Sequence, residues 1–303
     1  MTTPLSDRVV LVTGGGRGIG RSHCLKLAEL GAAVVVNDPG VHRDGQSGGD
    51  GAGPAAAVVA EIEQAGGKAV AHTGSVAIWD EARDMVDTAV SAFGTLTGVV
   101  NNAGILRDAT VVNTTEADWD AVVDVHLKGT FAVTHHACNY WRDRSRAGRP
   151  VAARVVNTVS GSGLWGNVGQ GAYGAAKAAI ANFTTVVAME AHRYGVTSNA
   201  ISPLAMSRMT DKLFADRADD PALEPDRSSA VVAWLQSLES SWLTGQILRI
   251  DGAKLTRIKG YSEHDACYRA EDGVALRFAE IGLAARWLWD VFPRGLAGPL
   301  TRS

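Results

Sequence analysis

The amino-acid sequence predicts an α/β fold, a single doubly wound parallel sheet of about seven strands with helices on both faces. Two observations lead to this prediction. From Arg8 onward, short runs rich in β-branched residues alternate with longer segments whose apolar residues recur at helical spacing. In addition, the glycine-rich segment 13–20 follows the first of these runs and opens the first helical segment, as expected in a βαβ unit.

The elements follow in alternating order along the chain. We expect strands at Val9–Val12, Ala32–Asn37, Ala69–Thr73, Gly98–Asn101, Arg154–Thr158, Thr197–Ile201 and Gln246–Ile250. We expect helices at Gly18–Leu30, Ile78–Phe93, Glu116–His136, Ala172–Tyr194 and Ser228–Leu238. Gly31 ends the first helix because glycine favours a helix C-terminus.

Two stretches interrupt this alternation. Residues 39–54, directly after the second strand, are rich in glycine and predict an irregular insertion rather than a part of the sheet. Residues 256–303 contain the apolar residues Trp287, Trp289 and Phe292, which are costly to leave in water. We therefore expect one domain over 1–255 and a C-terminal extension over 256–303 that packs on this domain or on a neighbouring subunit.

Composition excludes several classes of protein. The 303 residues are 46% hydrophobic and 20% charged, which suffices for a large globular core, and the net charge of -3 leaves no basic stripe for nucleic acid. Cys24, Cys138 and Cys267 are widely spaced, which predicts reduced thiols and no metal site. Residues 1–7 lack the pattern of a signal peptide, and no apolar run is long enough to span a membrane. We expect a cytoplasmic protein.

The glycine-rich turn has the spacing of a dinucleotide-binding site. Gly14, Gly18 and Gly20 permit a tight turn, a close approach of the backbone to a pyrophosphate, and close packing of helix on strand. The expected helix begins at Gly18, between Arg17 and Ile19. Its N-terminus contributes unpaired N–H groups and the positive end of the helix dipole. This context predicts a Rossmann-type domain. The alternative is a glycine-rich turn without a ligand.

Asp38 ends the second strand, where a carboxylate can accept hydrogen bonds from both hydroxyls of an adenosine ribose. Because it repels a 2′-phosphate, it favours NAD over NADP as the cofactor. Two alternatives stay open: Asp38 caps the following turn, or Arg17 and Arg43 offset the repulsion by pairing with a phosphate.

Tyr173 and Lys177 are spaced i and i+4, and so lie on one face of a helix. A phenol with a pKa of ~10 is a poor base, but a neighbouring ammonium and a positively charged nicotinamide lower that pKa. Ser160 follows a strand at the carboxyl edge of the sheet, where its hydroxyl can hold a substrate oxygen. These three residues predict acid/base chemistry on an alcohol or ketone.

Together these residues resemble the classical short-chain dehydrogenase/reductase family over Asp7–Leu255. The matching motifs are Thr-Gly-x-x-x-Gly-x-Gly at 13–20, Asn101-Asn102-Ala103-Gly104, Ser160, Tyr173-x-x-x-Lys177 and Thr244-Gly245-Gln246. The resemblance implies hydride transfer, with Tyr173 as acid/base, Ser160 orienting the substrate oxygen and Lys177 binding the nicotinamide ribose. It also implies a homodimer or homotetramer. The expected cofactor-binding residues are Gly14, Arg17, Gly18, Ile19, Gly20, Asp38, Ser75, Val76, Asn102, Ala103, Gly104, Tyr173, Lys177 and Pro203.

Three departures from the family pattern narrow the resemblance. His126 stands where an asparagine is usual, Ser75 where an aspartate is common, and Pro203-Leu204 where Pro-Gly is common. His126 either joins a proton relay, since imidazole both donates and accepts, or is a histidine with a structural role. With the 39–54 insertion, these features are similar to the dehydrogenase unit of multifunctional enzyme type 2. That branch oxidises (3R)-hydroxyacyl-CoA with NAD, and some relatives act on steroid 17β-hydroxyls.

The substrate is expected to be apolar. Ser160, Leu164, Trp165, Met206 and Met209 are the candidate substrate-binding residues, although an amphipathic surface helix also explains the methionines. Arg107 and Arg208 are candidates for pairing with CoA phosphates. We therefore predict an NAD-dependent secondary-alcohol dehydrogenase. The alternatives are an NADPH-dependent ketoreductase of the same fold and a nucleotide-binding relative without catalysis.

Overall fold

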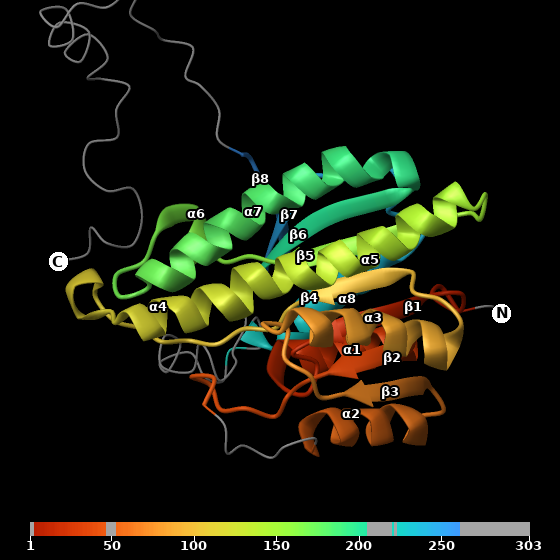
Figure 1. Cartoon of the computed structure of the whole chain (residues 1–303), viewed down its shortest axis with the longest axis horizontal. Coiled ribbons are helices and arrows are strands. Elements are labelled where there is room, and N and C mark those ends of the chain that lie inside the picture. The colour runs from red at the N-terminus through yellow and green to blue at the C-terminus, as the bar shows by residue number, and fades with distance from the viewer. Residues whose placement is uncertain (1–2, 47–52, 205–219, 221–222, 261–303) are drawn as a thin grey trace, which may run out of the picture. The chain divides into compact units, whose positions relative to one another are not determined.

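The computed structural model describes residues 3–46, 53–204, 220 and 223–260. Its centre is an eight-stranded sheet in the order β3-β2-β1-β4-β5-β6-β7-β8, of which only the β7–β8 pair is antiparallel (Figure 1). The strands are β1 (Val9–Thr13), β2 (Ala33–Asn37), β3 (Lys68–His72), β4 (Gly98–Asn101), β5 (Ala153–Thr158), β6 (Val196–Leu204), β7 (Ile247–Asp251) and β8 (Lys254–Ile258).

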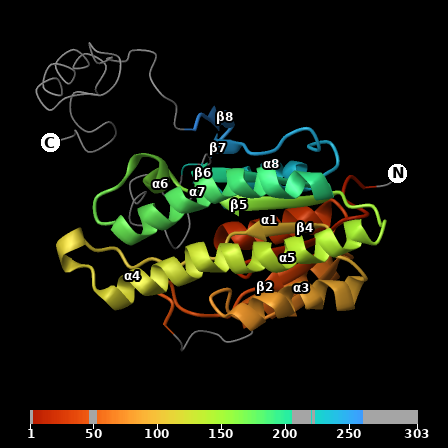
Figure 2. The same cartoon turned by 45° about the horizontal axis from the view of Figure 1, so that its top comes forward.

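Helices connect the parallel strands. They are α1 (Gly18–Glu29), α2 (Gly53–Gln64), α3 (Trp79–Phe93), α4 (Glu116–Val123), α5 (Gly129–Arg146), α6 (Gly161–Trp165), α7 (Gly171–Ala191) and α8 (Ser229–Gln236). A π-helical turn, Asp124–Lys128, joins α4 to α5, so that Figure 2 shows them as one long helix. Short 3₁₀ segments lie at Val111–Asn113, His192–Tyr194 and Pro225–Ser228.

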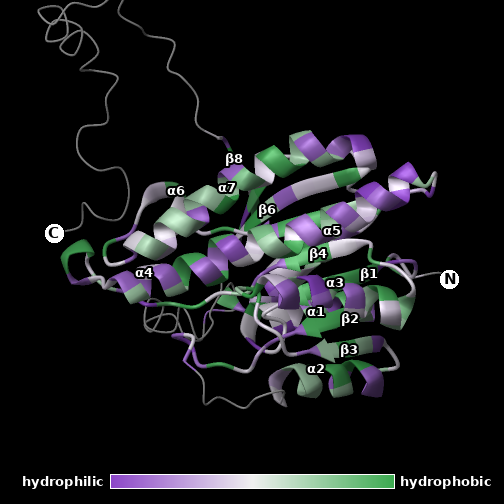
Figure 3. Ribbon diagram, in the orientation of Figure 1, coloured by the Kyte–Doolittle hydropathy of each residue, from purple (hydrophilic) through white to green (hydrophobic). Residues whose placement is uncertain are grey.

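Two apolar cores cover opposite faces of the sheet because successive strand residues point to opposite sides. Val10, Val12 and Val34 pack with α1, α2 and α8, whereas Leu11 and Val35 pack with α3, α5 and α7. Every residue of β1 is buried, and Figure 3 shows β1 and β2 as hydrophobic and the surrounding helices as mixed hydrophobic and hydrophilic. A strand buried on both faces is typical of a parallel sheet between helical layers.

The strand order places ligand-binding loops at one edge of the sheet. Strand β1 lies between β2 and β4, and the chain connections leave it in opposite directions at this point. In such sheets the crevice at the carboxyl ends of the strands, at the switch point, is where ligands bind. The loops that follow β1, β2, β3 and β4 carry the residues expected to bind the cofactor.

The predicted α/β class is confirmed, and the seven expected strands are present with bounds shifted by up to three residues. The helix expected at Glu116–His136 is instead α4 and α5, joined by the π-helical turn and extending to Arg146. Three other elements are additional. Helix α2 begins at Gly53, inside the predicted insertion, and Pro54 occupies the start of the helix, where its missing N–H costs nothing. The short α6 follows Ser160. Strand β8 is largely exposed, so no apolar pattern marks it in the sequence.

Strand β8 extends the sheet to Ile258, so residue 255, the expected end of the domain, lies within this strand. The predictions for Met206, Met209, Arg208, Cys267 and the tryptophans after residue 285 concern residues outside those described, as does the part of the insertion at 47–52. No helix among the described residues is long and apolar enough to cross a membrane.

Candidate active site

The glycine-rich turn requires glycine for two reasons. Gly14 and Gly18 have positive φ angles of 63° and 51°, which side chains on L-residues disfavour. Gly14 also lies against the loop after β4, where an added β-carbon would come within 2.9 Å of Ala103 Cα. A β-carbon on Gly20 would collide with the Gly14 carbonyl. The turn is therefore packed tightly against the residues that follow β4, with the N-terminus of α1 at the pocket.

Thr13 and Asn102 join these two loops. The Thr13 hydroxyl accepts hydrogen bonds from the backbone N–H groups of Asn102 and Ala103, at 3.0 and 3.1 Å. In return, the Asn102 side-chain amide donates to the carbonyls of Thr13 and Gly14, at 3.1 and 3.2 Å. This reciprocal bonding fixes the floor of the pocket at the switch point of the sheet.

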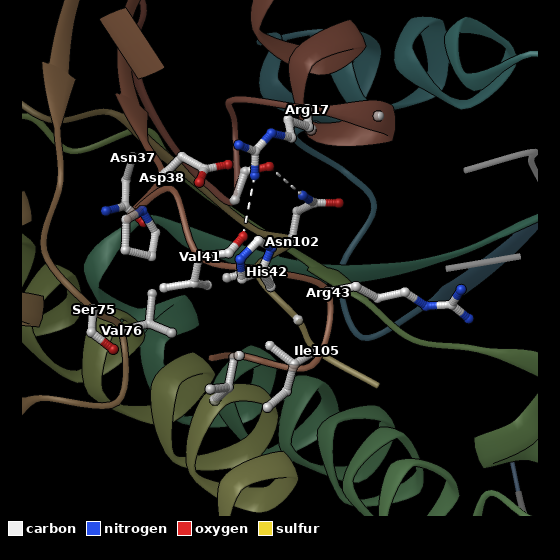
Figure 4. Close-up of a pocket in the computed structure, with 18 of the residues that line it drawn as sticks. Arg17, Asn37, Asp38, Val41, His42, Arg43, Ser75, Val76, Asn102 and Ile105 are labelled. Carbon is white, nitrogen blue, oxygen red and sulfur yellow. Dashed lines mark hydrogen bonds between the residues drawn. The ribbon is translucent and has the colours of Figure 1, made fainter. Parts of the chain in front are cut away.

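A pocket opens at this edge (Figure 4). Its lining includes eleven of the residues expected to bind the cofactor, namely Gly14, Arg17, Gly18, Ile19, Gly20, Asp38, Ser75, Val76, Asn102, Ala103 and Gly104. These residues come from the loops after four different strands. Exposed backbone N–H groups at a helix N-terminus, a carboxylate and apolar walls are the groups that a dinucleotide requires, so the pocket fits such a cofactor.

The Asp38 carboxylate is almost buried, and both of its oxygens accept backbone hydrogen bonds. One oxygen accepts from Gly16 N–H in the glycine-rich turn at 3.0 Å, and the other from Gly40 N–H at 2.8 Å. Asp38 therefore caps the turn that follows it and also lines the pocket. Each carboxylate oxygen has a second lone pair, so the two contacts leave acceptor capacity toward a ligand.

Residues 41–46 of the insertion form one wall of the pocket. Val41, His42 and Arg43 line it, and Arg17 Nη1 donates to the Val41 carbonyl at 3.2 Å (Figure 4). Across the pocket, Leu106 N–H donates to the Arg43 carbonyl at 3.1 Å. The described part of the insertion is thus fastened to the chain after β4. Of these wall residues the sequence indicated Arg43 alone, and nothing in the types of Val41 and His42 marks them.

Arg107 strengthens this connection. Its Nε donates to the Asp44 carbonyl at 2.8 Å, and its Nη1 forms an ion pair with Asp118 at 3.0 Å on the first turn of α4. The guanidinium is therefore engaged within the chain. Arg107 holds the wall of the pocket, and its pairing with CoA phosphates stays a prediction.

Ser75 and Val76 line the opposite side of the pocket. The Ser75 N–H donates to the Glu81 carboxylate, and the Ser75 hydroxyl accepts from Ala77 N–H at 3.3 Å. Val76 packs directly against Gly129. A β-carbon added to Gly129 would come within 2.6 Å of Val76 Cγ2. This close contact brings the loop after β3 against the start of α5.

Ser160, Tyr173 and Lys177 converge at the carboxyl end of β5. Lys177 Nζ lies 5.7 Å from the centre of the Tyr173 ring and donates to the Thr158 carbonyl at 2.6 Å. Burial lowers the pKa of Lys177 to about 7. Burial also raises the pKa of Tyr173, while a hydrogen bond with Ser160 acts in the opposite direction. In the chain by itself the phenol is therefore protonated at neutral pH, and the lowering of its pKa expected from Lys177 is not found.

His126 lies in the π-helical turn between α4 and α5, directly beside Tyr173. The two rings meet edge to face at 5.1 Å, and His126 Nε2 lies 2.8 Å from the Ile105 carbonyl oxygen and 3.1 Å from its nitrogen. Burial and the nearby Lys177 lower the pKa of His126 to about 3, so the imidazole is neutral. Its Nδ1 is buried without a partner among the described residues. Gly104 leaves the space that this ring fills.

Besides Ser160, which directly precedes α6, the candidate substrate residues that the structure describes lie on α6. Leu164 is half-buried, and Trp165 is exposed with the Arg249 guanidinium 4.9 Å above its ring. Gly163 allows α6 to pack closely on α7, since a β-carbon there would come within 2.7 Å of Lys177 Cβ. Pro203 is half-buried near the end of β6. It is not among the residues that line the pocket of Figure 4.

One residue beside the site was not recognised in the sequence. Gln170 directly precedes α7, and its side chain bonds to Asp108, Ser162 and Asn167. Its position three residues before Tyr173 was visible in the sequence, but a glutamine at the start of a helix is common and has no chemistry of its own.

Comparison with known proteins identifies the family. The family model for short chain dehydrogenases matches residues 8–218. A hydroxyacyl-CoA dehydrogenase, ChsB1, of Mycobacterium tuberculosis is 41% identical over 265 residues, which cover 85% of this chain and 81% of that protein. A peroxisomal multifunctional enzyme type 2 of Drosophila melanogaster is 44% identical over 230 residues, covering 75% of this chain and 36% of that enzyme.

A crystal structure of a short chain dehydrogenase from Mycobacterium avium superposes with a TM-score of 0.85 at 46% identity, over 96% of this chain and 97% of that chain. The predicted resemblance, including the similarity to multifunctional enzyme type 2, is confirmed. Family members are oxidoreductases that use a nicotinamide cofactor. The chain belongs to the short-chain dehydrogenase/reductase family and is an enzyme of that family.

Proposed function

We propose that this protein is an NAD-dependent dehydrogenase that oxidises a secondary alcohol on an apolar substrate, a 3-hydroxyacyl-CoA or a hydroxysteroid. The observation that carries the proposal is the convergence of Ser160, Tyr173 and Lys177 beside a pocket that fits a dinucleotide. The similarity to a hydroxyacyl-CoA dehydrogenase supports the acyl-CoA substrate class.

The roles of the residues follow from their positions. Nicotinamide, when bound, supplies the acceptor for the hydride that leaves the carbinol carbon. The Tyr173 phenolate removes the hydroxyl proton, and the Ser160 hydroxyl donates to the same substrate oxygen. Lys177 retains a partial positive charge at neutral pH, 5.7 Å from the centre of the Tyr173 ring, and favours the phenolate once the site contains further positive charge. Neutral His126 packs against the Tyr173 ring and restricts its orientation.

Asp38 supports NAD as the cofactor, because its nearly buried carboxylate in the pocket disfavours the additional phosphate of NADP. A second candidate, an NADPH-dependent ketoreductase, is favoured by Arg17 and Arg43, which line the same pocket. Measuring kcat/KM with both cofactors decides between them. A preference for NADP of tenfold or more, about 1.4 kcal/mol, contradicts the proposal.

The substrate is tested with a panel of 3-hydroxyacyl-CoA esters of different chain lengths and hydroxysteroids, following NADH absorbance. We expect the highest kcat/KM for one of these two classes, in the oxidative direction. If short polar alcohols are oxidised as fast as every member of the panel, the apolar substrate class is wrong. The third alternative, a nucleotide-binding relative without catalysis, predicts NAD binding with no turnover of any substrate.

We also propose that the enzyme is a cytoplasmic homodimer or homotetramer. Phe131, Val186 and Met189 expose apolar side chains on α5 and α7, and self-association buries such surface. Light scattering of the purified chain measures the oligomeric state, and cell fractionation tests the location. A monomer at micromolar concentration contradicts the first expectation, and activity that sediments with membranes or organelles contradicts the second.

A further inference from the structure

Gln170 stands three residues before Tyr173, and its side-chain amide is fully hydrogen-bonded. Oε1 accepts from the Ser162 hydroxyl at 2.6 Å and from Asn167 Nδ2 at 3.0 Å. Nε2 donates to the Asp108 carboxylate, at 3.2 and 3.3 Å to its two oxygens. Because the reversed amide would place its oxygen against that carboxylate, the network determines the orientation of the amide.

Gln170 and its partners Asp108 and Ser162 belong to three segments that meet at the candidate active site. Asp108 follows the cofactor-pocket loop after β4, Ser162 belongs to α6, and Gln170 itself precedes α7. Backbone contacts reinforce this junction, since Ala109 N–H donates to the Gly169 carbonyl at 2.8 Å and Ala109 bridges to Gln170. The hydrogen bonds of the Gln170 side chain therefore connect three segments: the loop that lines the pocket, the segment that carries Ser160 and the helix that carries Tyr173.

The path from Gln170 to Ser160 is short. Ser162 donates its hydroxyl hydrogen to Gln170, and Ser162 N–H donates to Ser160 Oγ at 3.3 Å. Ser160 Oγ thus accepts one hydrogen bond from Ser162, and its own hydroxyl hydrogen remains available to another acceptor. The interaction of Ser160 with Tyr173 lowers the pKa of Tyr173, whereas the negative charge of Asp108 raises it.

We propose that Gln170 is a positioning residue for the reaction: anchored by Asp108, it holds Ser162 so that the Ser160 hydroxyl is directed at Tyr173 and the substrate oxygen. This inference rests on the proposed function of Ser160 and Tyr173. The alternative is that Gln170 only closes the loop before α7. A loop contact affects stability, whereas a positioning residue affects the ionisation of Tyr173 and kcat.

The first test removes the hydrogen bonds of Gln170 while keeping its length. We expect Gln170→Met to lower kcat at least tenfold, with little change in the KM for NAD, because Gln170 is not among the residues lining the cofactor pocket. Gln64→Met, an exposed glutamine at the end of α2, is the matched control and leaves kcat unchanged. Wild-type kcat in Gln170→Met overturns the proposal.

The second test exchanges the amide and the carboxylate. Gln170→Glu sets two carboxylates against each other, so we expect a tenfold or greater loss of kcat and a pH profile for oxidation that moves to higher pH. In the double variant Asp108→Asn with Gln170→Glu, the new amide at position 108 donates to the new carboxylate at position 170. The Ser162 hydroxyl can still donate to that carboxylate. It should return kcat to within about threefold of wild type. Additive losses in the double variant contradict the proposal.

A readout that needs no turnover separates this inference from the proposed function. The absorbance of phenolate, measured as the difference between each protein and its Tyr173→Phe counterpart, follows the titration of Tyr173. We expect the pKa of Tyr173 to rise in Gln170→Met and Gln170→Glu, and to return in the double variant. An unchanged titration with lowered thermal stability shows that Gln170 only closes the loop. An inactive wild type with the expected titrations contradicts the proposed function alone.

Discussion

Lys177 and His126 are buried beside Tyr173, and in both residues burial disfavours the charged form. The pKa of Lys177 falls to about 7 and that of His126 to about 3. The two residues differ at neutral pH, because Lys177 retains a partial positive charge and His126 retains none. Lys177 therefore brings positive charge to within 5.7 Å of the centre of the Tyr173 ring, whereas His126 acts through its shape and its hydrogen-bonding nitrogens.

The phenol itself is tested by Tyr173→Phe. Removing the hydroxyl removes the acid/base, so kcat for alcohol oxidation is expected to fall by roughly 10²–10⁴-fold. Since burial raises the pKa of Tyr173, oxidation by the wild type should become faster as the pH rises. Steady-state rates across pH measure both effects, with Tyr194→Phe in the 3₁₀ segment after α7 as the control. Full turnover in Tyr173→Phe contradicts the catalytic assignment.

The burial of Lys177 is predicted to lower the free energy of unfolding of the chain. Its pKa is lower in the folded chain than in the unfolded chain, so the cost is absent above pH ~10.5, increases as the pH falls toward 7, and is constant below that. Lys177→Met should therefore be more stable than the wild type near pH 7 and lose that advantage toward pH 10, by at most about 1.4 kcal/mol per pH unit. Urea unfolding at several pH values measures the difference. A difference that does not vary with pH contradicts this account.

At the scale of elements, the insertion after β2 differs most from its sequence description. Its composition indicates an irregular segment, and residues 39–46 do lack helix and strand. Yet hydrogen bonds from Leu106 and Arg107 fasten this segment across the pocket. The insertion thereby becomes a wall of the cofactor pocket, and the residues that hold it lie more than 60 positions away in the sequence.

Arg107→Met tests this wall. The methionine keeps an unbranched apolar stem but loses the guanidinium, and with it the hydrogen bond to the Asp44 carbonyl and the ion pair with Asp118. We expect the KM for NAD to rise about five- to tenfold, roughly 1–1.4 kcal/mol, with kcat nearly unchanged. Arg83→Met, which removes an exposed ion pair on α3, is the control. A fall in kcat without a change in KM contradicts the role of Arg107 as a support of the pocket.

At the scale of the whole molecule, a buried histidine that is neutral at pH 7 lies on each side of the sheet, and both affect how stability varies with pH. His23 on α1 is fully buried against the Ser229 hydroxyl, and burial lowers its pKa to about 3, as it does for His126. Below pH ~6.5 the unfolded chain binds protons at these positions and the folded chain does not. The free energy of unfolding should therefore fall with decreasing pH, by up to about 1.4 kcal/mol per unit for each histidine.

His23→Gln isolates one of these contributions. Between pH 6 and 4 its free energy of unfolding should decrease less steeply than that of the wild type, by roughly 1 kcal/mol per pH unit. Chemical unfolding at a series of pH values gives both slopes. His192→Gln, at an exposed position, should leave the wild-type slope unchanged. Equal slopes in His23→Gln and the wild type would show that His23 does not contribute to acid lability.

The sequence by itself determined the class of fold, the positions of the seven principal strands, the family and the candidate triad of Ser160, Tyr173 and Lys177. It did so because strand and helix periodicity, glycine positions and the i, i+4 spacing are local properties of the chain. Helix α2 and strand β8 were missed because the first begins inside a glycine-rich stretch and the second lies exposed at the edge of the sheet.

Only the tertiary structure decided how burial changes the charges at the site and which side chains meet across the chain. The double contact of Asp38 with Gly16 and Gly40, the support from Arg107, and the bonding of Gln170 to Asp108 and Ser162 join residues from different loops. The pKa values of Lys177 and His126 depend on how much water the fold excludes. Such long-range contacts and desolvation leave no local pattern in the sequence.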